Sequence, residues 1–306
     1  MNSDVLFIGA GRPRPELFAA AERVFRDLEA RFSRFLDDSE LSHLNRHAGA
    51  PVSVSDEMLR ILETAVSLHR RTGGIFDPAI LPDLEAAGYD RTFDDVARDG
   101  DGAPAARPTR AHSIADFEID RVQRTVRAPD GARIDLGGIG KGFTVDAAIE
   151  VVRPYGDVLI DAGGDIHALG DGPDGDGWVI GVSDPLDASI QLDLVRLHDE
   201  AIATSATATR RWRRGGRWLN HIIDPRTGEP TESATVSASV IAATATEAEI
   251  FAKCALILGP AQGARFLETQ GARGLFVLKD GNVMRTAGWP GIAPSTGKER
   301  ITCHAE

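Results

Sequence analysis

The stretch that decides the expected fold is residues 134–143, Ile134-Asp135-Leu136-Gly137-Gly138-Ile139-Gly140-Lys141-Gly142-Phe143. The sequence predicts a strand over Ala132 to Leu136 and a helix over Phe143 to Arg153. Four glycines therefore join the predicted strand to the predicted helix. Glycine lets backbone amides approach a ligand closely, and a helix N-terminus with Lys141 beside it suits a phosphate or pyrophosphate. The alternative is a tight turn with a solvated lysine.

Strands and helices are also expected on both sides of this stretch. Apolar residues at helical spacing predict helices over Glu16–Phe35, Ser55–Thr72 and Thr246–Leu258. Strands are predicted over Val5–Ile8, Val158–Ile160, Trp178–Val182, Ile190–Val195 and Thr235–Ala242, with a hairpin of Gly274–Leu278 and Asn282–Arg285. No linker or repeat is visible. We therefore expect an α+β fold with one mixed α/β domain over residues 1–290 and a loose C-terminal tail over residues 291–306.

Composition excludes several classes of function. Among 306 residues, 34 Lys plus Arg face 46 Asp plus Glu, so the formal net charge is −12. That balance argues against nucleic acid or an anionic membrane as a partner, because both need a cationic face. Two cysteines, Cys254 and Cys303, cannot form a disulfide framework. No apolar run reaches the roughly 20 residues that span a bilayer, and the first nine residues have no basic segment and too short an apolar core for a signal peptide. We expect a cytoplasmic protein that does not insert into a membrane.

A second glycine turn, Ala162-Gly163-Gly164-Asp165, also ends an apolar strand. Two such turns at strand ends predict a shared ligand crevice. The alternative is a pair of plain turns.

The segment His221-Ile222-Ile223-Asp224-Pro225-Arg226-Thr227-Gly228 is the third candidate for chemistry. A histidine titrates near neutral pH and can take a proton from a hydroxyl. The alternative is a structural His221, with the Asp224 side chain bonded to its own turn.

These segments, in this order, resemble the FAD:protein FMN transferases, the ApbE-type flavin transferases. The likeness covers about residues 5–290. The matching stretches are Ser39-Glu40-Leu41 with Asn45, Gly73–Pro78, Asp135–Asp146, Gly163–Ile166, Thr204-Ser205, His221–Gly228 and the helix before Leu258-Gly259.

The resemblance implies that FAD binds in a crevice at the Gly-rich strand-to-helix turns. A threonine or serine hydroxyl of a partner flavoprotein attacks the FMN-side phosphorus, AMP leaves, and FMN stays attached by a phosphoester. Lys141 would hold phosphate, and His221 or Asp224 would assist deprotonation of the acceptor. The residues implied to line the FAD site are Asp77, Gly137, Gly138, Lys141, Asp146, Gly163, Gly164, Asp165, Ser205 and Thr227.

The resemblance also implies magnesium, held by a main-chain carbonyl of the Gly-rich turn, an Asp, and a Thr four residues later. This chain has Gly140, Glu249 and Lys253 at those positions. Glutamate can bind magnesium, but Lys253 cannot be a ligand because an ammonium has no free lone pair. Its charge would instead replace part of the metal's charge. The alternative is that Glu249 and Lys253 form a surface ion pair at helical spacing.

Two further functions remain open on these residues. The altered metal positions favour an FAD-binding carrier or sensor with weak or no transferase activity, whereas Lys141, His221 and Asp224 favour transfer. The same crevice could also hydrolyse FAD to FMN and AMP, with water as the acceptor.

Overall fold

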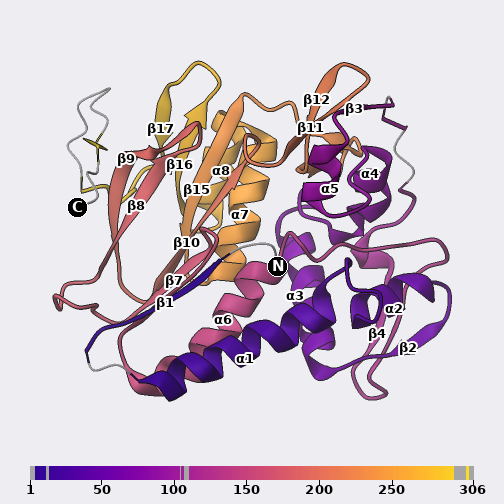
Figure 1. Cartoon of the computed structure of the whole chain (residues 1–306), viewed down its shortest axis with the longest axis horizontal. Coiled ribbons are helices and arrows are strands. Elements are labelled where there is room, and N and C mark those ends of the chain that lie inside the picture. The colour runs from indigo at the N-terminus through magenta and orange to yellow at the C-terminus, as the bar shows by residue number, and fades with distance from the viewer. Residues whose placement is uncertain (1–3, 12–13, 104, 107–109, 293–300, 303–306) are drawn as a thin grey trace. The chain divides into compact units, whose positions relative to one another are not determined.

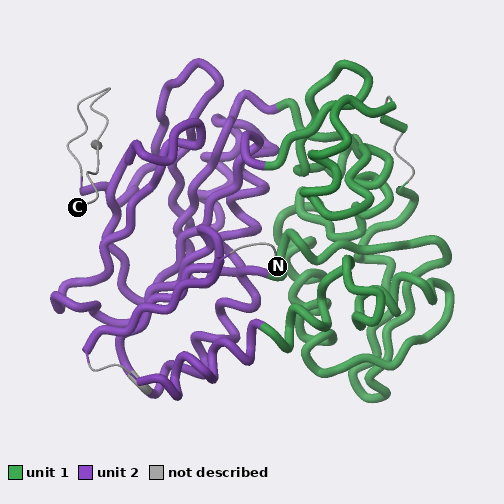
Figure 2. Tube along the Cα trace, viewed as in Figure 1, with its two compact units in different colours: residues 1, 26–140, 210–232 green, residues 2–25, 141–209, 233–306 purple. Residues whose placement is uncertain are grey.

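The computed structural model describes residues 4–11, 14–103, 105–106, 110–292 and 301–302. The chain divides into two compact units (Figure 2). Unit 1 holds residues 1, 26–140 and 210–232, and unit 2 holds residues 2–25, 141–209 and 233–306. Over the residues that the structure describes, the chain therefore passes from one unit to the other after residues 25, 140, 209 and 232.

Unit 2 is built on a seven-stranded sheet in which every neighbouring pair is antiparallel (Figure 1). In spatial order its strands are β1 (Val5–Gly9), β6 (Val158–Ala162), β7 (Ile166–Leu169), β10 (Glu200–Ala206), β15 (Thr235–Ala242), β16 (Arg273–Leu278) and β17 (Val283–Arg285). Seven of the eight residues of β15 are buried, because layers cover both faces of the sheet.

One face of this sheet packs against the hairpin of β8 (Trp178–Asp184) and β9 (Asp187–Leu197). Side chains of β8 alternate strictly between buried and exposed, as a strand with one covered face requires. Helices α7 (Ala245–Leu258) and α8 (Pro260–Thr269) contact the sheet from the other side. Cys254 on α7 is buried, whereas Cys303 lies outside the described residues.

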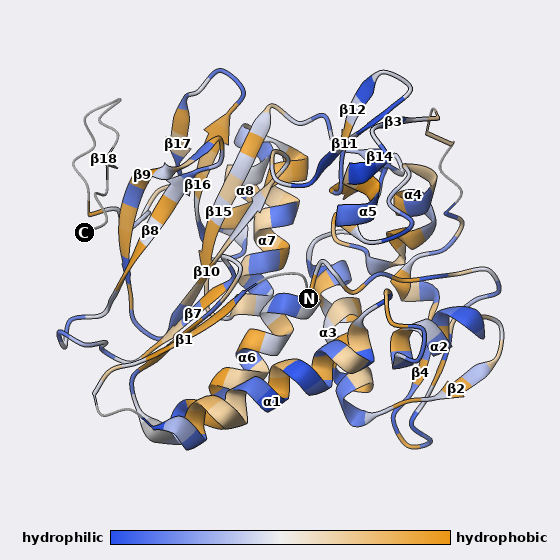
Figure 3. Cartoon of the chain, in the orientation of Figure 1, coloured by the Kyte–Doolittle hydropathy of each residue, from blue (hydrophilic) through white to orange (hydrophobic). Residues whose placement is uncertain are grey.

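Two further helices carry residues of unit 2. Helix α6 (Gly140–Val152) opens at the glycine-rich stretch, and α1 (Pro15–Phe32) follows β1. In Figure 3, hydrophobic and hydrophilic residues alternate around α1, as expected for a helix with one buried face.

Unit 1 combines short helices with small sheets. Its helices are α2 (Glu40–Arg46), α3 (Asp56–Arg71), α4 (Leu81–Ala86) and α5 (Phe93–Arg98). One three-stranded sheet has the spatial order β2 (Pro51–Ser53), β5 (Thr125–Arg127), β4 (Glu118–Asp120). A second has the order β12 (Arg217–Asn220), β11 (Arg211–Arg214), β3 (Asp101–Gly102). The third sheet is the pair β13 (Ile223–Asp224) and β14 (Glu229–Pro230). One apolar cluster joins segments distant in sequence: Leu84, Ala87, Tyr89, Val96, Trp212, Leu219 and Ile223.

The α+β expectation is confirmed, and the predicted helices and strands are found at or near their predicted positions. The exception is the strand predicted over Ala132–Leu136, which is wrong. The side-chain amide of Asn45 bonds both the N–H and the C=O of Ile134, at 2.9 Å each, so these groups pair with a side chain and not with a strand. The expectation of one domain over residues 1–290 and a loose tail stays a prediction; within that tail, β18 (Ile301–Thr302) pairs with β9.

Candidate functional site

Helix α6 begins at Gly140, three residues before its predicted start at Phe143. A Cβ on Gly142 would lie 2.5 Å from the carbonyl oxygen of Ala245 and 2.7 Å from the amide nitrogen of Thr246. The first turn of α6 can therefore approach the first turn of α7 only because residue 142 has no side chain. A Cβ on Gly140 would meet no atom within 4 Å.

Lys141, Asp165 and Glu249 form a cluster of charged side chains, which we call the Lys141 cluster. The ammonium of Lys141 hydrogen-bonds to Asp165 Oδ2 and lies 3.9 Å from Glu249 Oε1. The other oxygen of Glu249 accepts a hydrogen bond from the amide of Gly142 at 2.9 Å. Asp165 is only 1% exposed and Glu249 only 4%. Two buried carboxylates thus hold one lysine at the start of α6.

The electrostatics of the Lys141 cluster reflect its burial. The pKa of Asp165 is raised to about 7, chiefly by burial and also by the negative charge of Glu249, while the positive charges of Lys141 and Lys253 act in the opposite direction. The Lys141 side chain keeps 20% of its surface exposed. A partly exposed ammonium beside a helix N-terminus is suited to binding a phosphate group.

The turn at Gly163 and Gly164 connects β6 to β7, so it joins two strands and not a strand to a helix. Both glycines have positive φ, 64° and 92°, as a two-residue type I′ hairpin turn requires. The turn brings Asp165 to the start of β7, where it meets Lys141. Turn geometry alone accounts for both glycines, and their role in FAD binding stays a prediction.

Asp146 on α6 secures the N-terminus of α7. Its carboxylate accepts hydrogen bonds from the amides of Ala245 and Thr246 at 2.8 and 2.9 Å, and from the hydroxyl of Thr246 at 2.6 Å. Nδ1 of the buried His167 lies 2.9 Å from the same carboxylate. These four contacts give Asp146 a structural function, and its predicted contact with FAD is untested.

The segment from His221 to Gly228 contains β13 and the turn that leads from it to β14, and Asp224 organises this turn. The amide and guanidinium of Arg226 bind both carboxylate oxygens of Asp224 at 2.7 to 3.2 Å. The hydroxyl and amide of Thr227 both donate to the Asp224 carbonyl. His221 is half-buried at the start of this segment. Asp224 therefore has the turn-stabilising contacts that one of the two sequence interpretations required.

In unit 1, Asp77 is buried within a network around Arg110. Asp77 Oδ1 accepts from the amides of Ala79 and Ile114 at 2.9 and 3.1 Å, and Oδ2 accepts from Arg110 at 2.8 Å. Arg110 also bonds the carbonyl of Pro225 and lies 3.3 Å from Asp83. Arg110 thus connects the Asp77 turn to the segment that carries Asp224.

The remaining predicted residues lie on other elements. Ser205 is half-buried on β10, opposite Ala238 of β15. Gly137 donates its amide to Asp135 at 2.6 Å, immediately before Gly138. Lys253 lies on α7, one helical turn after Glu249.

The residues at the implied magnesium positions do not form a suitable donor set. Magnesium demands near-octahedral oxygen ligands at about 2.0–2.1 Å. Lys253 offers no lone pair, and the oxygens of Glu249 already face the amide of Gly142 and the ammonium of Lys141. A carbonyl at Gly140 would add only one ligand. In the described ranges, no group of three or more His, Cys, Asp or Glu is placed to hold a metal ion. The donor set therefore does not fit a resident magnesium ion.

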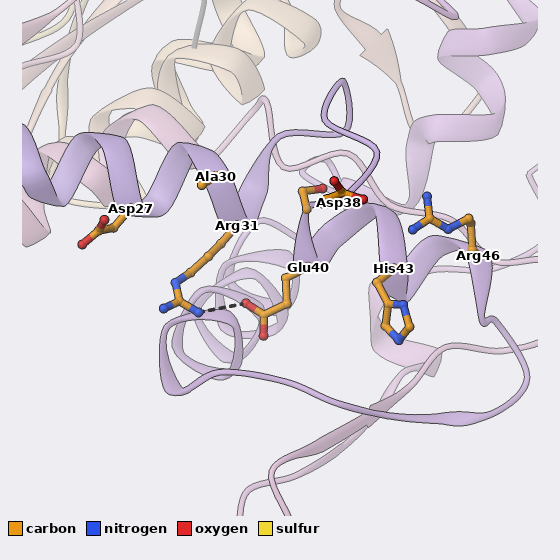
Figure 4. Close-up of a pocket in the computed structure, with 8 residues that line it drawn as sticks. Asp27, Ala30, Arg31, Asp38, Glu40, His43 and Arg46 are labelled. Carbon is orange, nitrogen blue, oxygen red and sulfur yellow. Dashed lines mark ion pairs between the residues drawn. The ribbon is translucent and has the colours of Figure 1, made fainter.

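None of the predicted site residues lines either of two cavities of unit 1. The larger, of about 630 Å³, is lined by charged side chains of α1 and α2, with Arg31 and Glu40 3.5 Å apart (Figure 4). A flavin ring needs mostly apolar walls, so this cavity does not suit it. The smaller, of about 240 Å³, is bordered by Arg110 and His112.

Sequence reasoning missed Arg110, His167 and the pairing of Glu249 with the start of α6. Arg110 directly follows a Gly-, Pro- and Ala-rich stretch and carries no motif. His167 lies inside a short apolar strand. The ion pair of Arg226 with Asp224 was also missed, although the sequence carries a signal for it, since an arginine two residues after an Asp in a turn can fold back onto that Asp.

Comparison with known proteins matches most of the chain. The ApbE family model matches residues 4–276. A FAD:protein FMN transferase from Treponema pallidum is 32% identical over 300 residues, covering 90% of this chain and 82% of that protein. Another from Vibrio cholerae is 26% identical and covers 84% of this chain and 78% of that protein. The crystal structure of the ApbE protein from Thermotoga maritima has a TM-score of 0.81 at 26% identity, covering 93% of this chain and 94% of that one.

The fold and the matched length place the chain in a single class of α+β proteins. It belongs to the ApbE family. None of the helices in the described ranges has the length and apolar character needed to span a bilayer.

Proposed function

We propose that this chain transfers FMN from FAD to a threonine or serine hydroxyl of a partner flavoprotein and releases AMP. The observation that carries the proposal is the 32% identity, over 90% of the chain, to a protein named FAD:protein FMN transferase. The Lys141 cluster supports it, because phosphoryl transfer depends on positioned positive charge more than on covalent catalysis.

In this reaction the acceptor oxygen bonds to the FMN-side phosphorus, and the bond from that phosphorus to the bridging oxygen breaks. AMP leaves with the bridging oxygen. Lys141 would offset charge on the phosphate oxygens, held in place by Asp165 and Glu249.

The proton of the acceptor hydroxyl needs a base, and we assign that function to His221 over Asp224. Both oxygens of Asp224 accept hydrogen bonds from Arg226, which makes the carboxylate a poor acceptor for a further proton. An imidazole changes protonation near neutral pH. Asp224 and Thr227 would hold the turn that positions His221.

The other implied contacts with FAD and the cytoplasmic location are part of the same proposal. The contacts are those of Asp77, Gly137, Gly138, Asp146, Gly163, Gly164, Asp165, Ser205 and Thr227. The magnesium that the resemblance implies is left out of the proposal, because the donor set at Glu249 and Lys253 does not fit it. Cell fractionation would test the location.

The test is to incubate the purified chain with FAD and each of two domains that carry an acceptor threonine, and to follow in-gel flavin fluorescence and AMP release. We expect covalent fluorescence on the acceptor, a mass gain equal to an FMN group, and loss of about 100-fold or more in rate for His221→Ala. The matched control is His198→Ala, an exposed histidine that pairs with Asp171.

Other outcomes would identify other functions. Free FMN and AMP without labelled acceptor would indicate hydrolysis of FAD. FAD that stays bound and intact with both acceptors would indicate a carrier or sensor. An unchanged rate in His221→Ala would contradict the assignment of His221 as the base.

A further inference from the structure

We propose that Lys253 takes the place of a divalent cation, so that this chain binds the pyrophosphate of FAD with two lysines, Lys141 and Lys253, and no resident metal. The inference deepens the proposed function and rests on it. It arises from the misfit between the implied magnesium ligands and the residues that the structure brings together.

The charges of the site balance without a metal. Asp165 and Glu249 supply two buried carboxylates, 1% and 4% exposed. Lys141 contacts the first and approaches the second at 3.9 Å. The charge of Lys253 also acts on Asp165, where it opposes the effect of burial on the pKa. Two carboxylates thus share this site with the Lys141 ammonium and with the field of Lys253, and buried charges need such compensation.

One oxygen of each carboxylate already accepts a hydrogen bond. Glu249 Oε2 accepts from the Gly142 amide at 2.9 Å, and Asp165 Oδ2 accepts from Lys141. A magnesium ion would have to displace these donors and would also meet the repulsion of Lys253. A divalent cation is therefore disfavoured both by its ligands and by its neighbours.

The alternative interpretation, in which Glu249 and Lys253 form an ion pair on the surface, does not agree with the burial of Glu249. Glu249 is only 4% exposed and belongs to the Lys141 cluster, so it is not a solvated helix residue. Lys253 follows it by four residues on α7, which keeps both on one side of that helix. A pyrophosphate arriving at Lys141 would add negative charge to this site, and Lys253 is placed to balance it.

The test measures FAD binding to the whole protein by flavin fluorescence, in EDTA and in excess magnesium, and Mn²⁺ binding to the FAD-free protein by electron paramagnetic resonance. For the wild type we expect FAD dissociation constants that agree within about twofold in the two conditions, and no stoichiometric Mn²⁺. Lys253→Thr should bind FAD about tenfold more weakly in EDTA, recover in magnesium, and bind one Mn²⁺.

The matched control is Lys279→Thr, which removes a lysine from the turn between β16 and β17 and should behave as the wild type. Thermal unfolding of both variants checks that they are folded. Stoichiometric Mn²⁺ on the wild type, a tenfold or greater loss of its FAD affinity in EDTA, or equal FAD affinities of the two variants in EDTA would each overturn the inference.

The two proposals fail in different ways. Labelling of the acceptor by the wild type only when magnesium is present would overturn the role of Lys253 and leave the transferase intact. A protein that binds no FAD in either condition would overturn both.

Discussion

At the scale of single residues, Gly142 combines two requirements in one position. Its amide donates to Glu249 at 2.9 Å, and its missing side chain leaves room for the backbone of Ala245. A backbone neighbour cannot move aside as a flexible side chain can. Gly142 therefore couples the start of α6 to the start of α7.

We predict that Gly142→Ala lowers the free energy of unfolding by about 1–3 kcal/mol, because the new methyl group would overlap backbone atoms of α7. Gly140→Ala is the matched control, since a Cβ there meets no atom within 4 Å, and it should change stability by less than about 1 kcal/mol. Urea unfolding followed by circular dichroism measures both. Equal stabilities of the two variants would show that α6 and α7 do not meet closely at Gly142.

The residue types of the site were predictable from the sequence, but their partners were not. The glycines and Lys141 predicted a phosphate-binding turn at a helix start, and the structure has a helix start there. The contact of Lys141 with Asp165 joins residues 24 positions apart, and that of Gly142 with Glu249 joins residues 107 apart. Neither separation leaves a periodic pattern, because both contacts depend on how whole strands and helices pack.

At the scale of elements, α7 depends on α6 for its N-terminal hydrogen bonds. The first amides of a helix have no partner within the helix. Asp146 accepts from two of them, those of Ala245 and Thr246, while Thr244 caps the amide of Glu247 at 3.1 Å. A side chain of one helix thus completes the end of another.

We predict that Asp146→Asn lowers the free energy of unfolding by about 1.5–3 kcal/mol, because charge-assisted hydrogen bonds are lost and an amide NH₂ faces backbone donors. Glu150→Gln on the same helix is the control, since Glu150 pairs with Arg153 at the surface, and it should cost less than about 0.5 kcal/mol. Chemical unfolding of both variants measures these two changes in the free energy of unfolding. Similar losses in the two would mean that Asp146 contributes no more than a surface charge.

Elements with strong periodicity were predictable, and those held by side chains were not. The 3.6-residue spacing of Met58, Leu62 and Ala65 predicted α3, and in the structure the Ser55 hydroxyl caps this helix by accepting from the Met58 amide at 3.1 Å. The alternation of apolar and charged residues over Ala132–Leu136 satisfied the rule for a strand equally well. It is irregular because Asn45, 89 residues away, takes both hydrogen-bonding groups of Ile134.

At the scale of the whole molecule, neither unit is a continuous piece of the chain. Unit 1 consists mainly of residues 26–140, but residues 210–232 supply Trp212, Leu219 and Ile223 to its apolar cluster. The indole of Trp212 also donates to the carbonyl of Ala87 at 2.9 Å. The core of unit 1 is therefore complete only when both segments are present.

We predict that residues 26–140 expressed alone show no cooperative unfolding transition, because part of their core is missing. Joining residues 210–232 to them through a flexible linker should restore a transition and bury the Trp212 indole, seen as blue-shifted fluorescence. The control is the joined chain with Trp212→Ala. A cooperative transition in residues 26–140 alone would show that this segment forms a core without Trp212.

Because unit 1 is formed by two separated segments of the chain, its folding cannot be completed until late in protein synthesis. A nascent chain cannot finish unit 1 until residue 232 has left the ribosome, although most of that unit has emerged by residue 140. At translation speeds of about 5–20 residues per second, the delay is on the order of 5 to 20 s. Throughout it, Leu84 and Val96 lack their partners from β11 and β13 and present an apolar surface. We therefore expect this protein to be a client of the chaperones that bind nascent chains, and to depend on them for its yield.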